Sequence, residues 1–483
     1  MEASYVQLDP AFEAYRQERL AHWGRIAHQQ DQSKSLGGYY HRRLCEVYQK
    51  LIPPGQKVIE LGCGWGDLLA SLKPSYGVGV DFSPEMVQRG RIAHPELTFV
   101  QEDVHSINLA EKFDYIICSD LLNDVWDVQK VFEQVQQLAG PKTRVIINTY
   151  SRLWQLPLDA ARQLGLATPV LQQNWLTVED ILNLSRLADF EPIYYWQEIL
   201  WPFATPLLSP TANKFLVKFW PIRHLGLTNF IVLRPVPAPA IQPHNPSVSI
   251  VIAARNEEGN IADIFTRTPD MGWDTELVFV EGHSTDHTYQ EVEKWMAQNP
   301  QRKCKLLKQV GVGKGDAIRL GFSQASGEVL IILDADLTVP PEDLPRFYQA
   351  LCSGKGDFVN GVRLVYPMEK QAMRLFNFLG NKFFSLAFSW ILRQPIKDTL
   401  CGTKALWNED YQRIAANRSY FGDFDPFGDF DLIFGASRLS LKIVDLPVRY
   451  RERKYGTTNI QRWSHGGLLL RMLFFAIRRL KFI

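Results

Sequence analysis

The sequence predicts an α/β protein of two domains, each built on an open and mainly parallel sheet, followed by a C-terminal amphipathic helix. Short Val- and Ile-rich segments alternate with helical patterns both before and after a proline-rich stretch, as parallel sheets require. In each half one such segment ends in residues suited to a bound nucleotide, at Glu60–Gly66 and at Asp334–Asp336. With 483 residues the chain is too long for one ordinary domain. We therefore expect two separate ligand sites.

The composition excludes several classes of protein. Hydrophobic residues make up 46% of the chain, which is enough for folded cores. The net charge is +1, so no overall field favours nucleic acid, and we expect no nucleic-acid partner. Six scattered cysteines without metal-type spacing, and a polar N-terminus, are typical of a cytoplasmic protein.

The elements are expected in the following order. Residues 1 to about 50 form amphipathic helices, and five strands follow at Lys57–Leu61, Gly77–Asp81, Leu97–Gln101, Phe113–Cys118 and Arg144–Asn148. Residues 151–200 read as a helical insertion, with further strands near Pro192–Trp196 and Asn229–Leu233. Residues 235–246 contain five prolines, which fix φ and remove backbone donors, so this segment should be a stiff linker. The predicted domains are therefore residues 1–234 and 247–460, with residues 461–483 as the C-terminal helix.

A glycine-rich turn ends the first strand of the N-terminal half. Glu60 precedes the turn Gly62–Gly66, where glycines let the backbone bend tightly and approach a ligand. Asp81 ends the second strand about twenty residues later, where an acidic side chain can accept hydrogen bonds from ribose hydroxyls. Asp103 follows the third strand, where it can reach an adenine ring or cap a helix. Because dinucleotide oxidoreductases share the turn, only the whole set is informative.

Together, Glu60–Gly66, Gly79–Met86 and Glu102–Asp103 resemble the class I S-adenosylmethionine-dependent methyltransferases over roughly residues 35–235. The resemblance implies a Rossmann-like sheet and S-adenosylmethionine as cofactor. It also implies that Gly62, Cys63 and Gly64 lie against the methionine moiety, that Asp81 holds the ribose and Asp103 flanks the adenine, and that Glu60 belongs to the cofactor-binding set.

Two further groups of polar residues lie near this expected cofactor site. Asp120 and Asn123 follow the fourth strand, where they could orient a methyl acceptor and are equally well placed to cap a helix. Residues Tyr39–His41 lie where such enzymes carry a lid, although plain packing is the favoured interpretation. Methyltransferases often leave catalysis to positioning, because a sulfonium is already a good leaving group.

In the C-terminal half, Asp334 and Asp336 directly follow a buried strand. Two carboxylates at a strand end can share a hard cation and the pyrophosphate that it carries, and Mg²⁺ or Mn²⁺ prefers oxygen ligands. Because such pairs are common, the accompanying segments decide the interpretation. These are Ser249–Glu258, Phe279–Thr288 and the glycine-rich Gly311–Ala317, which contains Lys314.

In that order and spacing, the segments resemble family 2 glycosyltransferases with the GT-A fold, a Rossmann-like fold, over about residues 247–460. The members most similar are those like dolichyl-phosphate mannose synthase. The resemblance implies a nucleotide-sugar donor and inversion at the anomeric carbon. It implies that Arg255, Glu257 and Glu281 line the nucleoside pocket, that Lys314 approaches the diphosphate, and that Asp334 and Asp336 bind the metal, Asp336 being also catalytic. Relatives usually have Asp-Asp where this chain has Glu281-Gly282.

Cationic residues further along the chain resemble those that bind the acceptor phosphate in relatives using lipid phosphates. They lie in residues 361–363 and 398–404, and in residues 453–459, where Asn459 replaces the usual final lysine. The expected acceptor contacts are therefore Arg363, Lys404 and Arg453. A phosphate acceptor needs no base, whereas a sugar hydroxyl does. Asp429 and Asp431 are the candidates for that base, or else helix caps or arginine partners.

The C-terminal tail is basic and apolar. Between Arg449 and Lys481 we count nine basic residues and one acidic residue, in a segment rich in Leu and Phe. A basic amphipathic helix can lie on an anionic membrane surface, or it can dock on its own domain. Residues 373–392 are too interrupted by polar side chains to span a membrane, which takes about 20 mostly apolar residues. We expect peripheral association with the inner face of the membrane.

The leading hypothesis is a bifunctional enzyme. One domain transfers a sugar from a nucleotide-sugar to a polyprenyl-phosphate or related lipid or glycan acceptor, and the other methylates a substrate of the same pathway. Two alternatives are that the sugar acceptor is soluble, and that the methyltransferase-like domain is a scaffold or regulator.

Overall fold

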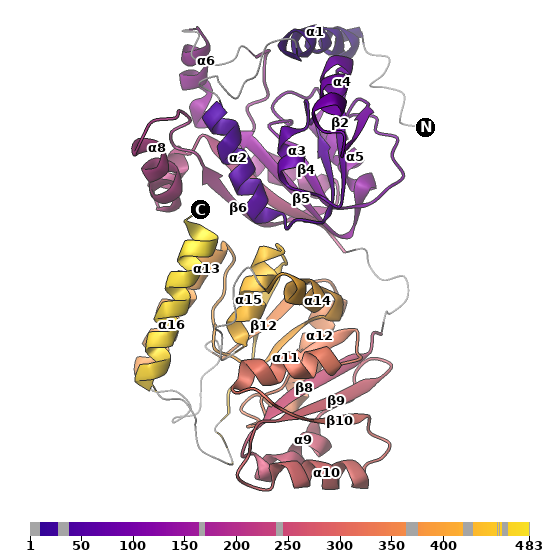
Figure 1. The fold of residues 1–483 in the computed structure, drawn as a ribbon, viewed down its shortest axis with the longest axis vertical. Coiled ribbons are helices and arrows are strands. Elements are labelled where there is room, and N and C mark those ends of the chain that lie inside the picture. Colours follow the sequence, from indigo (N-terminus) through magenta and orange to yellow (C-terminus); the bar gives the residue numbers. More distant parts are fainter. Residues whose placement is uncertain are drawn as a thin grey trace. The chain divides into compact units, whose positions relative to one another are not determined.

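The computed structural model describes residues 10–27, 38–163, 170–237, 245–363, 375–418, 428–451, 453, 455 and 462–482, with residues 375–379 and 462–466 by their backbone alone. The chain forms two compact units, the first up to Val236 together with Phe482 and the second from Pro237 to Lys481. Each unit contains a seven-stranded sheet with helices on both faces (Figure 1). Two Rossmann-like α/β units were expected, and this is confirmed.

The first sheet is parallel over five strands and antiparallel at one edge. Its order is β3 (Thr98–Gln101), β2 (Tyr76–Asp81), β1 (Lys57–Leu61), β4 (Phe113–Ser119), β5 (Ala139–Tyr150), β7 (Thr228–Pro235) and β6 (Phe190–Glu198). The strand order reverses between β1 and β4, and in such sheets a ligand crevice lies outside the carboxyl ends of the strands at that point.

The central strands bury both faces, which explains their continuous apolar sequences. Ile59 and Ile116 pack into the core on one face, and Val58 and Ile117 into the core on the other. The helices of this unit are α1 (Pro10–Ala27), α2 (Gly38–Leu51), α3 (Asp67–Ser71), α4 (Pro84–Ala93), α5 (Val128–Leu138), α6 (Gln155–Gln163) and α7 (Val178–Leu187). Short helical turns follow at η3 (Arg152–Trp154), α8 (Leu208–Pro210), η4 (Thr211–Phe215), η5 (Leu216–Lys218) and η6 (Ile222–Leu225).

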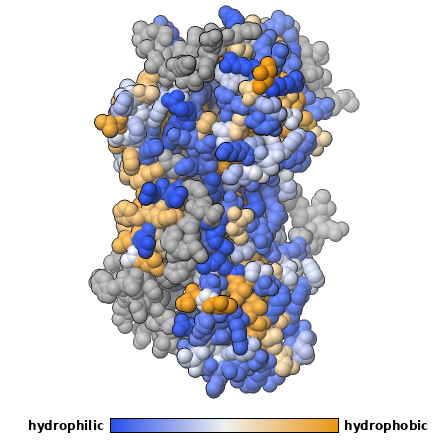
Figure 2. Space-filling model, in the orientation of Figure 1, coloured by the Kyte–Doolittle hydropathy of each residue, from blue (hydrophilic) through white to orange (hydrophobic). Residues whose placement is uncertain are grey.

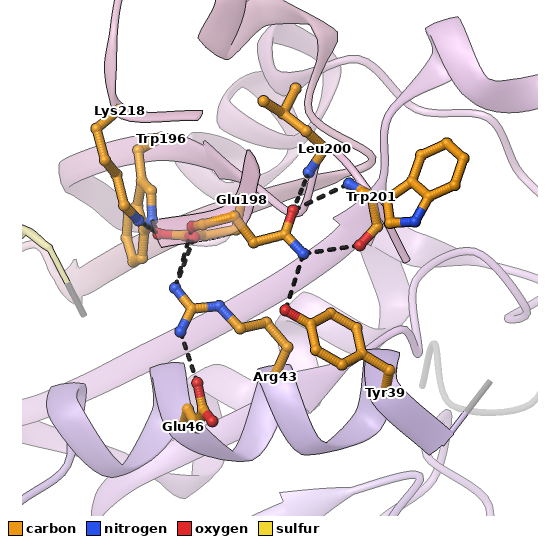
Figure 3. A network of polar contacts seen from close by, with 9 residues as sticks. Tyr39, Arg43, Glu46, Trp196, Glu198, Leu200, Trp201 and Lys218 are labelled. Atoms are coloured by element: carbon orange, nitrogen blue, oxygen red, sulfur yellow. Dashed lines mark hydrogen bonds and ion pairs between the residues drawn. The ribbon is translucent and has the colours of Figure 1, made fainter. Parts of the chain in front are cut away.

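A buried network of charges joins α2 to the end of β6 and to the segment after it (Figure 3). The Glu198 carboxylate pairs with Lys218, accepts a hydrogen bond from Trp196 Nε1 at 2.9 Å and lies 3.5 Å from Arg43 Nη2. At the solvent side, Arg43 Nη1 is 2.6 Å from Glu46. Arg43, Glu198 and Lys218 are all buried. The network holds α2 against the sheet, and α2 carries side chains that reach the candidate site.

The second sheet has the order β10 (Cys304–Lys308), β9 (Thr275–Glu281), β8 (Val248–Ala254), β11 (Val329–Ile332), β13 (Lys404–Trp407), β12 (Phe358–Val362) and β14 (Ile443–Pro447). The first four strands are parallel, and β13 runs antiparallel to both of its neighbours. The parallel strands therefore bring the ends of β8, β9 and β11 to one edge of the sheet.

The helices of this unit are α9 (Ile261–Arg267), α10 (Thr288–Gln298), α11 (Lys314–Gln324), α12 (Leu344–Cys352), α13 (Leu375–Leu392), α14 (Asn408–Ala416), α15 (Asp429–Arg438) and α16 (Arg462–Ala476), with short turns η7 (Glu258–Asn260), η8 (Pro341–Asp343) and η10 (Ile477–Lys481). The buried side chains of α16 join one core with Phe384 and Phe388 of α13; they are Leu469, Met472, Leu473 and Ala476. Helix α16 thus docks on its own unit. Among the described residues, no helix is long and apolar enough to cross a membrane.

Candidate active sites

The first candidate site begins at the glycine turn after β1. Gly62, Gly64 and Gly66 have φ angles of 68°, 54° and 85°, a region that other residues rarely adopt. A Cβ added to Gly62 would lie 2.7 Å from the Leu121 side chain. A Cβ added to Gly64 would meet no described atom within 4 Å. Gly64 therefore borders open space, as expected of a turn that a ligand approaches.

Asp81 and Glu60 flank this turn and are both buried. Asp81 accepts hydrogen bonds from the backbone N–H groups of Gly64 and Ser83, each at 2.9 Å, and burial raises the pKa of Asp81 to about 6. Asp81 thus holds the turn, and its oxygens keep further lone pairs for ribose hydroxyls. Burial raises the pKa of Glu60 to about 8, so this carboxyl is mainly neutral at pH 7. The Cys63 thiol is buried, and burial raises its pKa well above the ordinary value.

Asp103 lies at the far side of the same sheet edge, after β3. It accepts hydrogen bonds from the backbone N–H of His105 at 3.0 Å and from its Nδ1 at 2.6 Å. The described residues directly after Asp103 form a turn and no helix, so Asp103 is not a helix cap. Arg16 of α1 comes within 3.7 Å of the Asp103 carboxylate, and Phe12 stacks edge-on against the His105 ring. A helix was expected here, but its contact with this site was not, although the aromatic and arginine side chains of α1 were a usable signal.

Asp120 directly follows β4 and has a left-handed φ of 52°. The Tyr40 hydroxyl is 3.0 and 3.1 Å from the two Asp120 oxygens, and Asn148 Nδ2 donates to Oδ1 at 2.7 Å. Tyr40 is therefore a site contact as well as a packed side chain. Asn123 is buried and bridges Asn174 O at 2.8 Å and the backbone N–H of Tyr150 at 3.1 Å, so its amide links two segments of the unit.

The second candidate site lies after β11, where Asp334 and Asp336 each face a cation. Lys314 Nζ, at the first residue of α11, is 2.5 Å from Asp334 Oδ1. Arg453 Nη2 is 2.6 Å from Asp336 Oδ2 and Arg453 Nη1 is 3.7 Å from Glu257. Burial raises the pKa of Asp334, but the Lys314 charge and hydrogen bond outweigh it, so the net pKa is lowered. The residues expected at the diphosphate and the metal therefore lie together.

The nucleoside side of this site is formed by the ends of β8 and β9. Glu257 is buried, accepts a hydrogen bond from Asn260 Nδ2 at 2.6 Å, and has its pKa raised by burial to about 7. Glu281 Oε1 accepts a hydrogen bond from the backbone N–H of Ser284 at 2.5 Å. Arg255 is exposed directly after β8. These three side chains occupy the sheet edge where a nucleoside was expected.

Lys404 and Asp429 are buried beside the acidic pair. Lys404 Nζ is 2.5 Å from the Cys401 carbonyl oxygen and 3.3 Å from Asp429 Oδ1. A Cβ on Gly402 would overlap the Asp334 carboxylate and the Lys314 ammonium, so the missing side chain leaves their space open. Lys404 therefore supports the charge cluster from inside the fold.

The start of α15 lies directly against the start of α11. A Cβ on Gly428, which precedes α15 with a φ of 74°, would lie 2.7 Å from the Gly315 Cα atom. Asp431, two residues into α15, pairs with Arg418 Nε at 2.9 Å. Of the two candidates for a base, Asp429 faces the charge cluster. Asp431 instead pairs with an arginine, which was the alternative role expected for it.

Arg363 is held by a buried carboxylate. Its Nε and Nη2 lie 2.7 and 2.8 Å from the two oxygens of Asp398. Burial alone would raise the pKa of Asp398, but the Arg363 charge and hydrogen bonds lower it to about 2. Two N–H donors of the Arg363 guanidinium are thus bonded to Asp398, and an acceptor phosphate could use only its other N–H donors.

A divalent cation fits the donor chemistry of Asp334 and Asp336, because carboxylate oxygens are hard ligands. Among the described residues no group of three or more His, Cys, Asp or Glu side chains could hold a metal ion. A cation here would thus rest on these two carboxylates and on donor phosphates, as Mg²⁺ commonly does. Asp336 Oδ1 already accepts two hydrogen bonds from Thr338, at 3.1 and 2.8 Å, and Oδ2 faces Arg453. The cation would compete with Arg453 for Asp336.

Comparison with known families assigns the two units. Residues 249–412 match the model of glycosyl transferase family 2, and residues 52–188 match a model described as a methyltransferase domain. The protein thus combines two transferase domains: the first unit carries a methyltransferase domain and the second a family 2 glycosyltransferase domain. Both resemblances seen in the sequence are confirmed.

Several curated proteins are similar to the second unit. A dolichol-phosphate mannosyltransferase of Pyrococcus furiosus is 32% identical over 35% of this chain and 49% of its own length. An undecaprenyl-phosphate 4-deoxy-4-formamido-L-arabinose transferase of Edwardsiella ictaluri is 36% identical over 43% of this chain and 61% of its own. Glycosyltransferase AglJ of Haloferax volcanii is 27% identical over 47% of this chain and 71% of its own length. The chain thus spans about half to seven tenths of these relatives.

Solved structures of methyltransferases align with part of the chain. A putative methyltransferase of Haloferax volcanii, solved with the Trm112 activator, has a TM-score of 0.35 and 16% identity, over 44% of this chain and 98% of that one. The N-methyltransferase NodS of Bradyrhizobium japonicum, solved with S-adenosyl-L-homocysteine, has a TM-score of 0.31 and 11% identity, over 45% of this chain and 97% of that one.

Proposed function

We propose that the protein is a bifunctional transferase of the kind expected from its sequence. The second unit transfers a sugar from a nucleotide-sugar to a polyprenyl phosphate, and the first methylates a substrate of the same pathway with S-adenosylmethionine. The observation that carries the first part is the cluster of Lys314, Asp334, Asp336 and Arg453 at the sheet edge. The polyprenyl-phosphate acceptor is supported by the names of the similar proteins, which act on dolichol phosphate or undecaprenyl phosphate.

In the proposed reaction, an oxygen of the acceptor phosphate attacks the anomeric carbon, and the bond from that carbon to the diphosphate breaks. The nucleoside diphosphate leaves with the bonding electron pair, so negative charge develops on it. Lys314 lies where it can stabilise that charge, and it needs no reorganisation because Asp334 already fixes it. A bound Mg²⁺ or Mn²⁺ would supply further charge stabilisation, held by Asp334 and Asp336.

The acceptor phosphate is already anionic, so no base has to remove a proton from it. Arg453 is the cation best placed to receive it, because its guanidinium bridges Asp336 and Glu257 next to the donor side of the site. Arg363 contributes less, since Asp398 engages two of its donors. Asp429 would act as a base only if the acceptor were a hydroxyl.

The test is a transfer assay with undecaprenyl phosphate and a panel of UDP-, GDP- and CMP-sugars, with Mg²⁺ or Mn²⁺. Asp336→Asn should reduce transfer at least a hundredfold, because one preorganised electrostatic group commonly contributes about 10²- to 10³-fold. Asp343→Asn is the matched control, since Asp343 forms an ion pair with a surface arginine three residues away, at 3.5 Å. Full metal-dependent transfer by Asp336→Asn would refute the assignment of the metal site.

Membrane association is part of this proposal. Apolar side chains of α13 and α16 remain exposed beside basic ones, and the surface over these helices is largely orange with separate blue patches in Figure 2. The apolar ones are Phe383, Leu386, Leu470 and Phe474, and the basic ones Lys382, Arg471, Arg478 and Arg479. Apolar and basic side chains together favour the surface of an anionic bilayer. We propose peripheral binding at the inner face of the membrane.

Co-sedimentation with vesicles of phosphatidylglycerol and phosphatidylcholine tests this surface. Phe474 is 75% exposed, and Phe474→Ser should weaken binding several-fold. Trp273→Ser is the control, because Trp273 is 70% exposed in the same unit but outside this surface. Equal loss in both variants, or none in either, would show that α16 is a purely structural helix and would favour a soluble acceptor.

The methyltransferase half of the proposal is tested by calorimetric titration with S-adenosylhomocysteine. Binding in the micromolar range is expected at the turn Gly62–Gly66. If no heat appears at millimolar ligand, the first unit is a scaffold or regulator, and the methyltransferase proposal is wrong.

A further inference from the structure

We propose that Asp120 is the proton acceptor of the methyl-transfer reaction, and that the methyl acceptor therefore attacks through a hydroxyl group. This inference rests on the proposed methyltransferase activity of the first unit. It goes beyond that proposal because it names a residue for the proton and a chemical class for the acceptor.

The position of Asp120 is the first support. It follows β4 directly, next to β1, at the point where the strand order of the sheet reverses. The next residue, Leu121, lies so close to Gly62 that a Cβ there would stand 2.7 Å from it. The loop that begins at Asp120 therefore borders the glycine turn, where the methionine end of the cofactor is expected. Asp120 as a whole residue is half-buried, and its carboxylate lies against Tyr40 and Asn148.

The fixed orientation of the carboxylate is the second support. Asp120 adopts a left-handed φ of 52°, which costs about 1 kcal/mol or more for a residue with a side chain. Tyr40 donates to the carboxylate, and Asn148 Nδ2 holds Oδ1 at 2.7 Å. Asn148 is itself oriented by the Tyr48 hydroxyl, 2.7 Å from its Oδ1. A carboxylate held by two neutral donors in a strained conformation is typical of a functional group.

The electrostatic surroundings suit a base that works near neutral pH. Burial raises the pKa of Asp120 to about 7, although the hydrogen bonds from Tyr40 and Asn148 lower it. The titratable groups around it are Tyr40 and Tyr48 of α2, Tyr150 of β5 and, beyond Tyr48, Glu60 of β1. None of these side chains can carry a positive charge, and burial raises the pKa of all four, so that they are mainly protonated at pH 7 and cannot take up the proton.

The proposed step is balanced. The hydroxyl oxygen forms a bond to the methyl carbon while the bond from that carbon to sulfur breaks, and the electron pair returns to sulfur. The proton of the hydroxyl passes to the Asp120 carboxylate, which leaves an ether, neutral S-adenosylhomocysteine and a protonated Asp120. Tyr40 can then accept a hydrogen bond from the new carboxylic acid, since a phenol both donates and accepts.

The experiment uses the full chain and two ligands that differ by a charge. S-adenosylmethionine carries a sulfonium and a methyl group, whereas S-adenosylhomocysteine carries neither. If Asp120 lies beside the transferred methyl group, the sulfonium lowers the pKa of Asp120 by about one unit. Calorimetry at pH 6.5 in two buffers should then show release of about half a proton with S-adenosylmethionine and much less with S-adenosylhomocysteine.

Asp120→Asn should abolish this difference in proton release. At pH 8 it should also weaken S-adenosylmethionine binding about tenfold relative to S-adenosylhomocysteine, since one pKa unit of coupling equals a factor of ten. Asp114→Asn, at the other end of β4, is the matched control and should leave both quantities unchanged; Asp114 accepts a bond from the backbone N–H of Lys57 at 2.9 Å.

Two results would overturn the inference while leaving the methyltransferase proposal intact. One is wild-type protein that binds both ligands with equal proton release. The other is Asp120→Asn protein that keeps the wild-type difference. Binding of neither ligand by the wild type would instead refute the proposed methyltransferase activity, and this inference with it.

Discussion

The buried charge network between α2 and β6 gives the most direct prediction about stability. Glu198→Gln removes the carboxylate charge that Arg43 and Lys218 share, while it keeps the size of the side chain. The Glu198 side chain is 1% exposed, and breaking such a buried pair from one side typically costs about 3 to 5 kcal/mol. Glu46→Gln removes a second carboxylate that pairs with Arg43, but the Glu46 side chain is 51% exposed, so its loss should cost about 0 to 1 kcal/mol.

The assay is urea unfolding followed by tryptophan fluorescence, because Trp196 donates to Glu198 and reports on the network. With a urea dependence of about 2 to 3 kcal/mol per molar, Glu198→Gln should lower the midpoint of the first unit by about 1 to 2.5 M. Glu46→Gln should shift it by a few tenths at most. Similar small shifts in both variants would refute the argument that this network holds α2 in place.

Three further predictions concern the two sites. Gly64→Ala should keep the fold, at a cost of about 1 to 2 kcal/mol for its left-handed φ. It should nevertheless lose S-adenosylhomocysteine binding in calorimetry, because the added Cβ would enter open space that the ligand needs, and unchanged affinity would contradict this. The first unit should lose stability as pH rises from about 4 to about 8, because burial raises the folded-state pKa of Asp81 to about 6 and that of Glu60 to about 8, above their unfolded values. Glu60→Gln should flatten urea midpoints measured at pH 5, 7 and 8.5, and an unaltered slope would count against it. Arg453→Gln should tighten Mn²⁺ binding several-fold in electron paramagnetic resonance titrations, because Arg453 competes for Asp336, and equal or weaker binding would show that it does not.

Short sequence patterns were sufficient to predict individual strands. The strand Lys57–Leu61 was predictable to the residue, since a parallel strand buried on both faces is a continuous apolar run closed by glycines. The carboxyl ends of β8 and β11 could be placed at one edge of the sheet, because neighbouring parallel strands end on the same side.

Contacts between distant segments could not be predicted from the sequence. Arg453 pairs with Asp336 across 117 residues, and nothing in either segment specifies that partner. Lys404 was expected to contact an acceptor phosphate, and its complete burial in β13, which runs antiparallel to β11, was not foreseen. The sequence states directly which residues are charged, but the groups that a charged side chain faces depend on strand order and register.

The close approach of Gly428 to Gly315 has a consequence for the spacing of Lys314 and Asp429. With no side chain of residue 428 between them, the starts of α11 and α15 lie against each other, and both helices direct their unpaired N–H groups and positive dipole ends to their starts. A side chain at position 428 would push these two helix starts apart, and with them Lys314 and Asp429, which are the first residues of the two helices.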